Sequence, residues 1–344
     1  MAKPSHDLPG GLLIIDKPQG VTSFDAVAAV RAALHTKKVG HAGTLDPMAT
    51  GMLIIGFGNA TRLLTTIVEH DKTYEATIRL GQRTTTDDAE GELIEPEAAT
   101  DEAIRHLTRE TIERTICKRF TGDIEQVPNA FSAIKINGKR AYDLAREGHA
   151  VELKARPVTV SEFTVLDMRH NTAENTAGEP VPVIDVDVRV SCSSGTYIRA
   201  LARDLGECLG IGGHLTRLRR TRIGRFDFAD ETVARRVVTA HAESYSFTNR
   251  EGETITRNKC VLDVSGEVLS RALTMAEAVR GAMPVVEITA QEAAELRFGR
   301  RIARHLDMEQ AAAVVPATQD VVALIAPANR TQAKPVTVFP SSHA

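Results

Sequence analysis

The stretch Gly40–Leu53 constrains the fold most, because it places a glycine-rich loop directly before an apolar strand. Its glycines permit tight turns and allow another molecule to approach the backbone closely. Pro47 restricts the preceding Asp46 to extended backbone geometry. An ordinary turn uses the same residue types, but the complete string favours a loop that holds a single carboxylate rigidly for chemistry.

The size and composition of the chain indicate a soluble globular protein. A length of 344 residues exceeds the usual size of one hydrophobic core, so two domains are expected. The sequence has neither a signal-like start nor an apolar run long enough to span a membrane, which predicts a cytoplasmic location. The four cysteines form no close pair, so neither a zinc site nor a disulfide framework is predicted.

Hydrophobic periodicity and capping residues predict a mixture of strands and helices. The predicted strands are Leu12–Ile15, Met52–Phe57, Tyr74–Leu80 (half-buried), Ile184–Cys192, Val321–Ala326 and Pro335–Phe339. Helices are expected after Thr22, over Asp101–Phe120, from Ile198 to Leu209, and from a Thr289–Glu292 capping box to Phe298. Residues 84–97 and 171–182 are predicted to be loops.

Two basic segments are candidates for contact with phosphates. The first, His214–Phe226, contains five arginines and no acidic residue. It favours a phosphate-contacting strand or, equally, a solvated strand edge. The second is a predicted hairpin turning at Asn137-Gly138, followed by a short helix to Gly148. The candidate RNA contacts in these segments are Lys135, Lys139, Arg140, Arg219 and Arg220.

The Gly40–Leu53 string resembles the signature of the TruB-like tRNA pseudouridine-55 synthases. Five further strings resemble that family in the same order, so the resemblance covers roughly residues 11–226: Asp16–Gly20, Lys72–Ala76, Leu80–Thr84, Ser132–Lys135 and Gly195–Arg199. It implies an α+β catalytic domain with a mixed or antiparallel sheet. The domains expected are residues 1–228, with a hairpin insert at about 124–152, a connecting region at 229–283, and a small β-rich PUA-like RNA-binding domain at 284–344.

The resemblance also assigns roles to individual residues. Asp46 is similar to the catalytic nucleophile of the family, and Arg199 to the arginine that pairs with it. A cation in the first turn of a helix opposes the helix dipole, so an anionic partner would explain the position of Arg199. Tyr74 matches the tyrosine that stacks on the base and is proposed as an acid or base. The remaining family positions, which hold the RNA or line the nucleoside pocket, correspond to His41, Tyr197 and Leu218.

These roles imply isomerisation of the T-loop uridine at position 55 of tRNA, after the nucleotide has been flipped out. The family uses no metal or organic cofactor, and neither a guide RNA nor an obligate protein partner is expected. Three chemical routes stay open for Asp46: attack on C1′ of the ribose, an indirect route through a glycal, and addition to C6 of uracil.

Three other functions are compatible with parts of the sequence. RNA-guided pseudouridine synthases share the Gly-Thr-Leu-Asp-Pro signature, although the hairpin insert favours a stand-alone enzyme. A non-catalytic RNA-binding protein could use the same surfaces, although Asp46, Tyr74 and Arg199 are all present. A glycosidase could use Asp46 as its nucleophile, but it would usually need a second carboxylate as acid, and the matched strings contain no convincing one.

Overall fold

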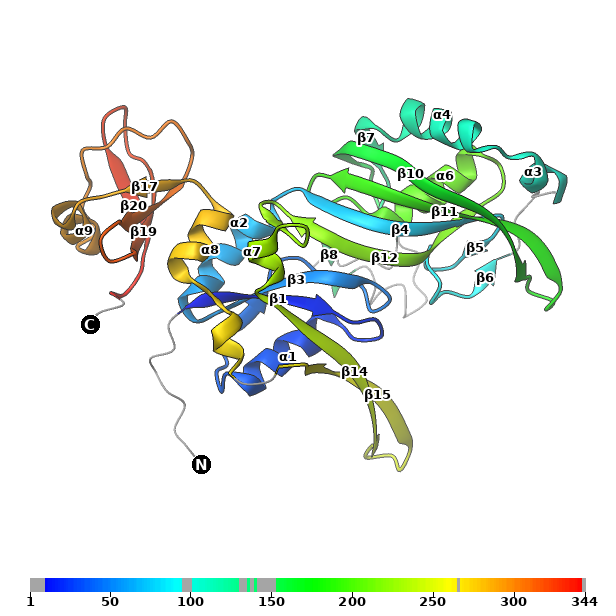
Figure 1. Ribbon diagram of the computed structural model, residues 1–344, viewed down its shortest axis with the longest axis horizontal. Helices are drawn as coiled ribbons and strands as arrows, with labels where there is room; N and C mark the ends of the chain where they lie inside the picture. Colours follow the sequence, from blue (N-terminus) through cyan, green and yellow to red (C-terminus); the bar gives the residue numbers. More distant parts are fainter. Residues whose placement is uncertain are drawn as a thin grey trace. The chain divides into compact units, whose positions relative to one another are not determined.

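The computed structural model describes residues 10–94, 101–129, 135–136, 139–140, 153–264 and 267–341 (Figure 1). The chain divides into two compact units. The first combines Met1–Glu69 with Arg222–Ala344, and the second is the continuous segment His70–Thr221. No helix within the described ranges is long and apolar enough to cross a membrane.

The first unit contains a mixed sheet centred on the predicted strand β1. β1 pairs antiparallel with β3 and parallel with β14, so that Ile14 lies opposite Ile54 on one side and Val237 on the other. The apolar runs of β1 and β3 are buried, which confirms both predictions. The strands are β1 (Gly11–Lys17), β2 (Val39–His41), β3 (Thr50–Phe57), β13 (Phe226–Asp227), β14 (Val237–Thr248), β15 (Thr254–Leu262) and β16 (Leu273–Thr274).

Short helices cover this sheet. Helix α1 begins after Thr22 as predicted, because the Thr22 hydroxyl accepts from the Asp25 amide at 3.1 Å. The Asp25 carboxylate accepts from the Thr22 amide at 2.7 Å and completes a capping box. The helices are α1 (Ser23–Ala33), η1 (Gly58–Leu63), α2 (Leu64–Val68), α7 (Glu231–Ala234), η2 (Val268–Arg271) and α8 (Met275–Ala282).

Residues 229–283, predicted as a connecting region, contain a long hairpin made by β14 and β15. In Figure 1 this hairpin extends away from the strands β1 and β3 of its unit. Residues 241–248 of its first strand are exposed, and they include the aromatic side chains Tyr245 and Phe247. The hairpin therefore gains little of its stability from burial beyond its base.

The C-terminal segment forms a small four-stranded sheet with one helix, in the strand order β17-β18-β19-β20. Its elements are β17 (Val285–Glu287), α9 (Ala290–Arg297), β18 (Ala311–Val315), β19 (Asp320–Pro327) and β20 (Ala333–Val338). The predicted capping box of Thr289 and Glu292 starts α9, and Gly299 follows its end with a φ of 74°. The expectation of a small β-rich C-terminal domain is confirmed, while its start at residue 284 stays a prediction.

The second unit is built on a sheet in the order β12-β4-β11-β10-β7. Its strands are β4 (Lys72–Leu80), β5 (Arg83–Thr84), β6 (Leu93–Ile94), β7 (Gly122–Gln126), β8 (Lys135–Ile136), β9 (Lys139–Arg140), β10 (Arg156–Glu174), β11 (Pro180–Cys192) and β12 (Gly213–Ile223), whose last residues enter the first unit. Its helices are α3 (Asp101–His106), α4 (Arg109–Arg119) and α6 (Ile198–Cys208). The predicted strands at β4 and β11 and the helix α6 are confirmed, together with the α+β fold class.

The structure corrects three local predictions in this unit. The helix expected over Asp101–Phe120 is two helices, because the hydroxyl of Thr108 caps a new helix. Most of the loop expected at residues 171–182 belongs to β10 and β11, which pair as far as Glu174 and Pro180. The polar face of β4 is less exposed than predicted, since Thr77 is buried and donates to Asp187 Oδ1 at 2.6 Å.

The loop predicted at residues 84–97 contains a short ladder in which β5 pairs with β6. The predicted hairpin is confirmed by its ladder, because Lys135 lies opposite Arg140 and Ile136 opposite Lys139. Its turn residues and the short helix expected after it lie outside the described residues.

Candidate active site

Asp46 lies in the first unit, in the loop that connects β2 to β3. The residue is half-buried, and its carbonyl accepts from the Ala49 amide at 3.1 Å. Gly43 and Gly51 flank the loop with φ values of 92° and 100°, in the left-handed region that other residues rarely adopt. The two glycines therefore allow the sharp bends that place Asp46 at the tip of the connection.

A buried serine fixes the residue before Asp46. The hydroxyl of Ser23 donates to the Leu45 carbonyl at 3.1 Å and accepts from the Leu45 amide at 2.8 Å. Ser23 is 3% exposed, so these bonds are shielded from water. They attach the loop to the start of α1.

A buried lysine and a glycine amide fix the residue after Asp46. The ammonium group of Lys17, which has no exposed surface, donates to the carbonyls of Pro18 at 2.9 Å, Val21 at 2.7 Å and Pro47 at 3.4 Å. The Gly20 amide donates to the same Pro47 carbonyl at 2.8 Å. Both neighbours of Asp46 are thus bonded to residues between Lys17 and Ser23, and the rigidity of the loop stays a prediction that these bonds support.

Arg199 occupies the first turn of α6 in the second unit and is 5% exposed. Its Nη1 atom lies 3.4 Å from Asp88 Oδ2 and donates to the Thr86 carbonyl at 3.1 Å. Asp88 is itself oriented, because its Oδ1 accepts from Thr86 Oγ1 at 2.6 Å and from the Glu90 amide at 3.1 Å. Asp88 therefore supplies an anionic partner of the kind that the helix start required.

Sequence reasoning did not single out Asp88, because it stands in a polar, acidic stretch that resembles an ordinary loop. The unfavourable cation in the first turn of α6 was the signal that an acidic partner exists. Nothing in the local pattern indicates which of the neighbouring carboxylates, Asp87 or Asp88, faces Arg199.

A second acid–base pair lies beside the first. Asp87 Oδ2 accepts from Arg203 Nη1 at 3.2 Å and from the amide of Asn129. Burial raises the pKa of Asp87 above its ordinary value, and this effect exceeds the lowering by Arg203 and Asn129. Arg203 also donates to the Val127 carbonyl at 2.8 Å, so the pair connects α6 to the end of β7.

Tyr197 precedes α6, and its backbone is held by the buried side chain of Gln126. The Tyr197 amide donates to Gln126 Oε1 at 2.8 Å, and Gln126 Nε2 donates to the Tyr197 carbonyl at 3.0 Å. Tyr74 on β4 and Leu218 on β12 are 8% and 6% exposed. Tyr74, Tyr197 and Leu218 belong to the second unit, as does Arg199. Asp46 and the half-buried His41 belong to the first.

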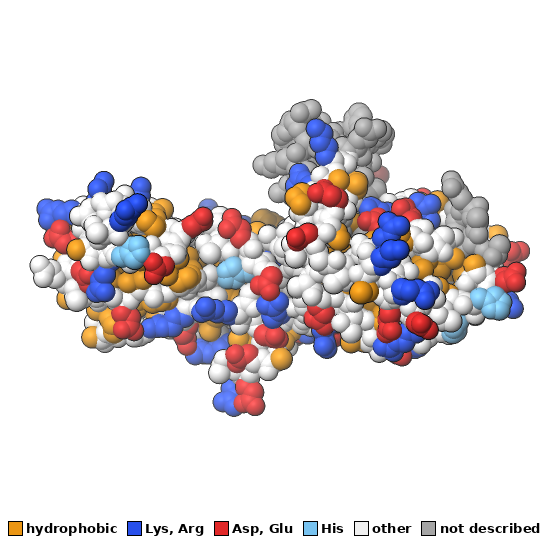
Figure 2. Space-filling model, turned by 90° about the horizontal axis from the view of Figure 1, so that it is seen from above, with side chains coloured by type: hydrophobic (Ala, Val, Ile, Leu, Met, Phe, Trp, Pro, Cys, Tyr) orange, Lys and Arg blue, Asp and Glu red, His pale blue; other side chains and the backbone are white. Residues whose placement is uncertain are grey.

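The basic candidates differ in their burial. Arg220 is 1% exposed and Arg219 is half-buried, whereas Arg217 on the same strand is exposed. Arg220 contributes to lowering the pKa of Lys72 to about 8, after the larger effect of burial. Arg220 is thus a buried residue of the second unit, and its contact with RNA stays a prediction. Figure 2 shows Lys and Arg side chains interspersed with Asp and Glu across the visible face, in keeping with a net charge of −3.

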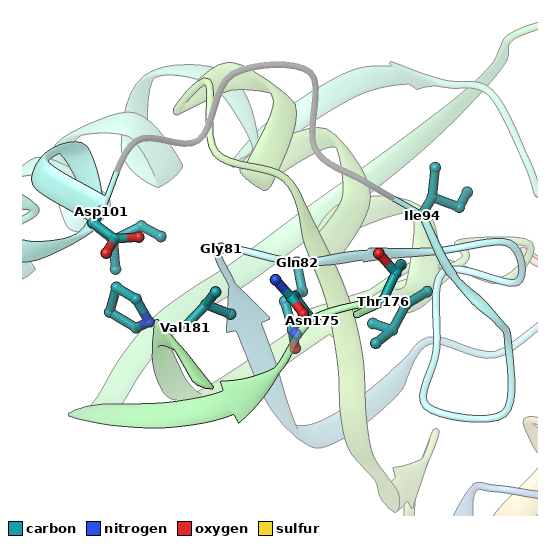
Figure 3. Close-up of a pocket in the computed structure, with 10 residues that line it drawn as sticks. Gly81, Gln82, Ile94, Asp101, Asn175, Thr176 and Val181 are labelled. Atoms are coloured by element: carbon teal, nitrogen blue, oxygen red, sulfur yellow. The ribbon is translucent and has the colours of Figure 1, made fainter. Parts of the chain in front are cut away.

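A small pocket lies elsewhere in the second unit, with a volume of about 140 Å³. Figure 3 shows Asp101 of α3, Gln82 after β4, and Asn175 and Thr176 of the β10–β11 turn around it. None of the predicted site residues lines it.

Family models match most of the chain. The model described as TruB family pseudouridylate synthase, N-terminal domain, matches residues 31–198. The tRNA pseudouridylate synthase B C-terminal domain matches residues 199–258, and tRNA pseudouridine synthase II, C-terminal, matches residues 283–340. The last match covers nearly all of the small β-rich domain.

Two relatives and one solved structure point to the same family as these models. The tRNA pseudouridine synthase B of Bifidobacterium longum strain NCC 2705 is 60% identical, covering 97% of this chain and 99% of the relative. The enzyme of the same name from Arthrobacter sp. strain FB24 is 46% identical and covers 97% of each chain. A solved Cbf5-Nop10-Gar1 complex contains a chain with a TM-score of 0.62 and 25% identity, covering 96% of this chain and 84% of that one. The chain therefore belongs to the TruB family of pseudouridylate synthases.

Proposed function

We propose that this protein isomerises the T-loop uridine at position 55 of tRNA to pseudouridine, with Asp46 as the catalytic residue. The observation that carries the proposal is the 60% identity to a tRNA pseudouridine synthase B over 99% of that relative. The loop geometry supports it, because both neighbours of Asp46 accept hydrogen bonds from Ser23, Lys17 and Gly20.

The reaction breaks the bond from C1′ of the ribose to N1 of uracil and forms a bond from C1′ to C5. C5 loses its hydrogen as a proton and N1 gains a proton. No redox change is needed, because the product is an isomer of the substrate. The base has to leave its stack before its atoms can be reached. A rigid loop is useful here, since holding a reacting group in a near-attack geometry removes much of the entropic barrier.

Residues of the second unit, together with His41 of the first, supply the other roles. We assign to Arg199 the task of keeping the Asp46 carboxylate ionised, because burial alone would raise the pKa of an enclosed carboxylate. A guanidinium can hold a carboxylate through two parallel hydrogen bonds. Tyr74 supplies an aromatic face for the flipped base, Tyr197 and Leu218 line the nucleoside pocket, and His41 holds the RNA loop.

The proposal includes a stand-alone enzyme that acts on tRNA in the cytoplasm. The Bifidobacterium and Arthrobacter relatives are named tRNA pseudouridine synthase B, whereas the solved structure is a complex of Cbf5 with Nop10 and Gar1. The predicted hairpin insert at residues 124–152, with Lys135, Lys139 and Arg140, is assigned to recognition of the substrate stem-loop.

Purified protein and an unmodified tRNA transcript test the proposal, in the absence of ATP, metal and guide RNA. Pseudouridine is then mapped by site-specific chemical labelling. A single T-loop modification is expected. Modification at another position would overturn the proposed substrate, and no modification by a folded preparation that binds the transcript would overturn the stand-alone activity.

A further inference from the structure

We propose that Asn258, on the β14–β15 hairpin, is a positioning residue for the Asp46 loop. It acts through Gly20, whose carbonyl accepts from the hairpin and whose amide donates to the residue that follows Asp46. The inference rests on the proposed function of Asp46, and it assigns part of the catalytic geometry to a hairpin that carries none of the predicted site residues.

The connection consists of two consecutive hydrogen bonds. Asn258 Nδ2 donates to the Gly20 carbonyl at 3.0 Å, and the Gly20 amide donates to the Pro47 carbonyl at 2.8 Å. Pro47 follows Asp46 directly, so the path from the hairpin to the nucleophile crosses Gly20, Pro47 and the peptide bond between Pro47 and Asp46. Displacing Gly20 therefore displaces the carbonyl that anchors the Asp46 loop.

The orientation of the Asn258 amide is itself fixed. Ser244, on the opposite strand of the hairpin, donates its hydroxyl proton to Asn258 Oδ1 at 2.7 Å. This bond identifies the oxygen of the side chain and leaves the amide nitrogen to face Gly20. The bond from Ser244 thus orients the Asn258 amide so that its nitrogen donates to the Gly20 carbonyl.

Gly20 lies in a turn that is held from two sides. Its φ is 84°, a conformation natural to glycine, and a Cβ atom added there would lie 3.1 Å from Asn258 Nδ2. Lys17 bonds the carbonyls of Pro18 and Val21 from inside the unit. Asn258 bonds the intervening Gly20 carbonyl from the hairpin. Removing either anchor leaves the turn with less restraint on the Pro47 carbonyl.

The hairpin offers a matched control. Ser246 and Thr256 form the next cross-strand pair on the same face, and their hydroxyls lie 2.9 Å apart. This pair is exposed, and the hydrogen bond that it makes stays within the hairpin. Ser246→Ala therefore removes a comparable hairpin bond without touching the Gly20 turn.

The first test measures the single-turnover rate and the Kd for unmodified tRNA transcript, so that product release does not mask the chemical step. Asn258→Ala is expected to lower the rate roughly fivefold to tenfold, the effect of one lost hydrogen bond, while Kd stays within twofold. Asn258→Asp keeps the acceptor for Ser244 but places a carboxylate oxygen against the Gly20 carbonyl, so its loss of rate should be at least as large as that of Asn258→Ala. Asn258→Gln retains an amide donor and should recover part of the rate.

Ser246→Ala is expected to keep the wild-type rate. An unchanged rate in Asn258→Ala, a change in Kd alone, or an equal loss in Ser246→Ala would each overturn the positioning role.

Amide hydrogen exchange supplies a readout that does not depend on activity. The amides of Gly20 and Ala49 should exchange several-fold faster in Asn258→Ala than in Ser246→Ala, because the turn and the loop open more often. Equal exchange in the two variants would overturn the coupling. If the wild-type protein makes no pseudouridine while this exchange difference is present, the proposed function fails and the structural coupling stands.

Discussion

The two regions that carry the predicted catalytic residues are held by different kinds of bond. The Asp46 loop is fixed mostly by main-chain carbonyls and amides, with one hydroxyl from Ser23 and one ammonium group from Lys17. Arg199 is held by a carboxylate, Asp88, next to the second acid–base pair of Asp87 and Arg203. Each of these bonds in the first region involves a main-chain group of the loop, whereas the second region contains two ion pairs between side chains.

The comparison teaches where each kind of restraint is useful. A loop that presents a carboxylate gains from neutral carbonyl acceptors, because further acidic side chains would raise the pKa of that carboxylate. A buried guanidinium gains from carboxylates, because an uncompensated buried charge is costly. Four substitutions test this difference, and they are described from the largest expected effect to the smallest.

The largest effect is expected for Asp46→Asn. The variant keeps the shape of the side chain but loses the carboxylate, so turnover should fall by at least about 1,000-fold. Affinity for tRNA should stay nearly intact, because one small contact changes. Single-turnover labelling and a binding titration measure the two quantities, and a loss of turnover clearly smaller than about 1,000-fold in a clean preparation would refute the assignment.

Lys17→Met tests the restraint on main-chain carbonyls in the first region. Methionine fills a similar volume but cannot donate, so three buried carbonyls lose a donor and the unfolding free energy should fall by about 3 kcal/mol. Urea unfolding measures the change. The control is Lys38→Met, which removes an exposed bond to Asn59 in the same unit and should cost less than about 1 kcal/mol. Equal losses would mean that the buried ammonium is not a special anchor.

Asp88→Asn tests the charged side. Asparagine keeps an acceptor for Thr86 but removes the charge opposite Arg199, so unfolding should be easier by about 2 to 3 kcal/mol and turnover should decrease. The matched control is Asp167→Asn, which removes one carboxylate from an exposed ion pair with Arg169 and should change stability by less than about 1 kcal/mol. A neutral outcome for Asp88→Asn would show that charge is not what holds Arg199.

The smallest effect concerns the pH dependence contributed by Asp87. Because burial raises its folded-state pKa, the protonated form contributes stability below the ordinary value of about 3.9, and this contribution is lost as pH rises through the folded value. Asp87→Asn lacks that titration. The stability of the variant relative to wild type should therefore rise between pH 4 and pH 7, as followed by urea unfolding. A relative stability that falls with pH would mean that Arg203 outweighs burial.

Sequence patterns predicted the helix starts and strands that depend only on residues close together in the sequence. The caps at Thr22 and Thr289 and the apolar run of β1 were found because the residues that form them are neighbours in sequence. The rigidity of the Asp46 loop was also predicted, since its glycines and Pro47 act on adjacent bonds. The N-cap Thr108, which divides the predicted helix, was a local signal that was overlooked.

The remaining features depend on pairing between distant residues. The stretch at 171–182 is rich in turn-forming residue types, but pairing between β10 and β11 overrides that preference. Thr77 is buried, and its hydroxyl donates a hydrogen bond to Asp187 on the neighbouring strand. No pattern along β4 reveals this partner. Similarly, the sequence marks Arg199 as needing an anion, and only the folded chain shows that Asp88 lies 3.4 Å from its guanidinium.

The first unit is formed by two segments that are far apart in the sequence, and this affects how the protein folds during translation. The parallel partner of β1 is β14, which is synthesised after the whole second unit. At ribosomal rates of 5–20 residues per second, β1 waits roughly 10 to 45 seconds for that partner. The continuous second unit can fold in the meantime. The nascent chain therefore carries an unfinished apolar strand edge during translation, and conditions that slow elongation should favour its capture by chaperones or its aggregation.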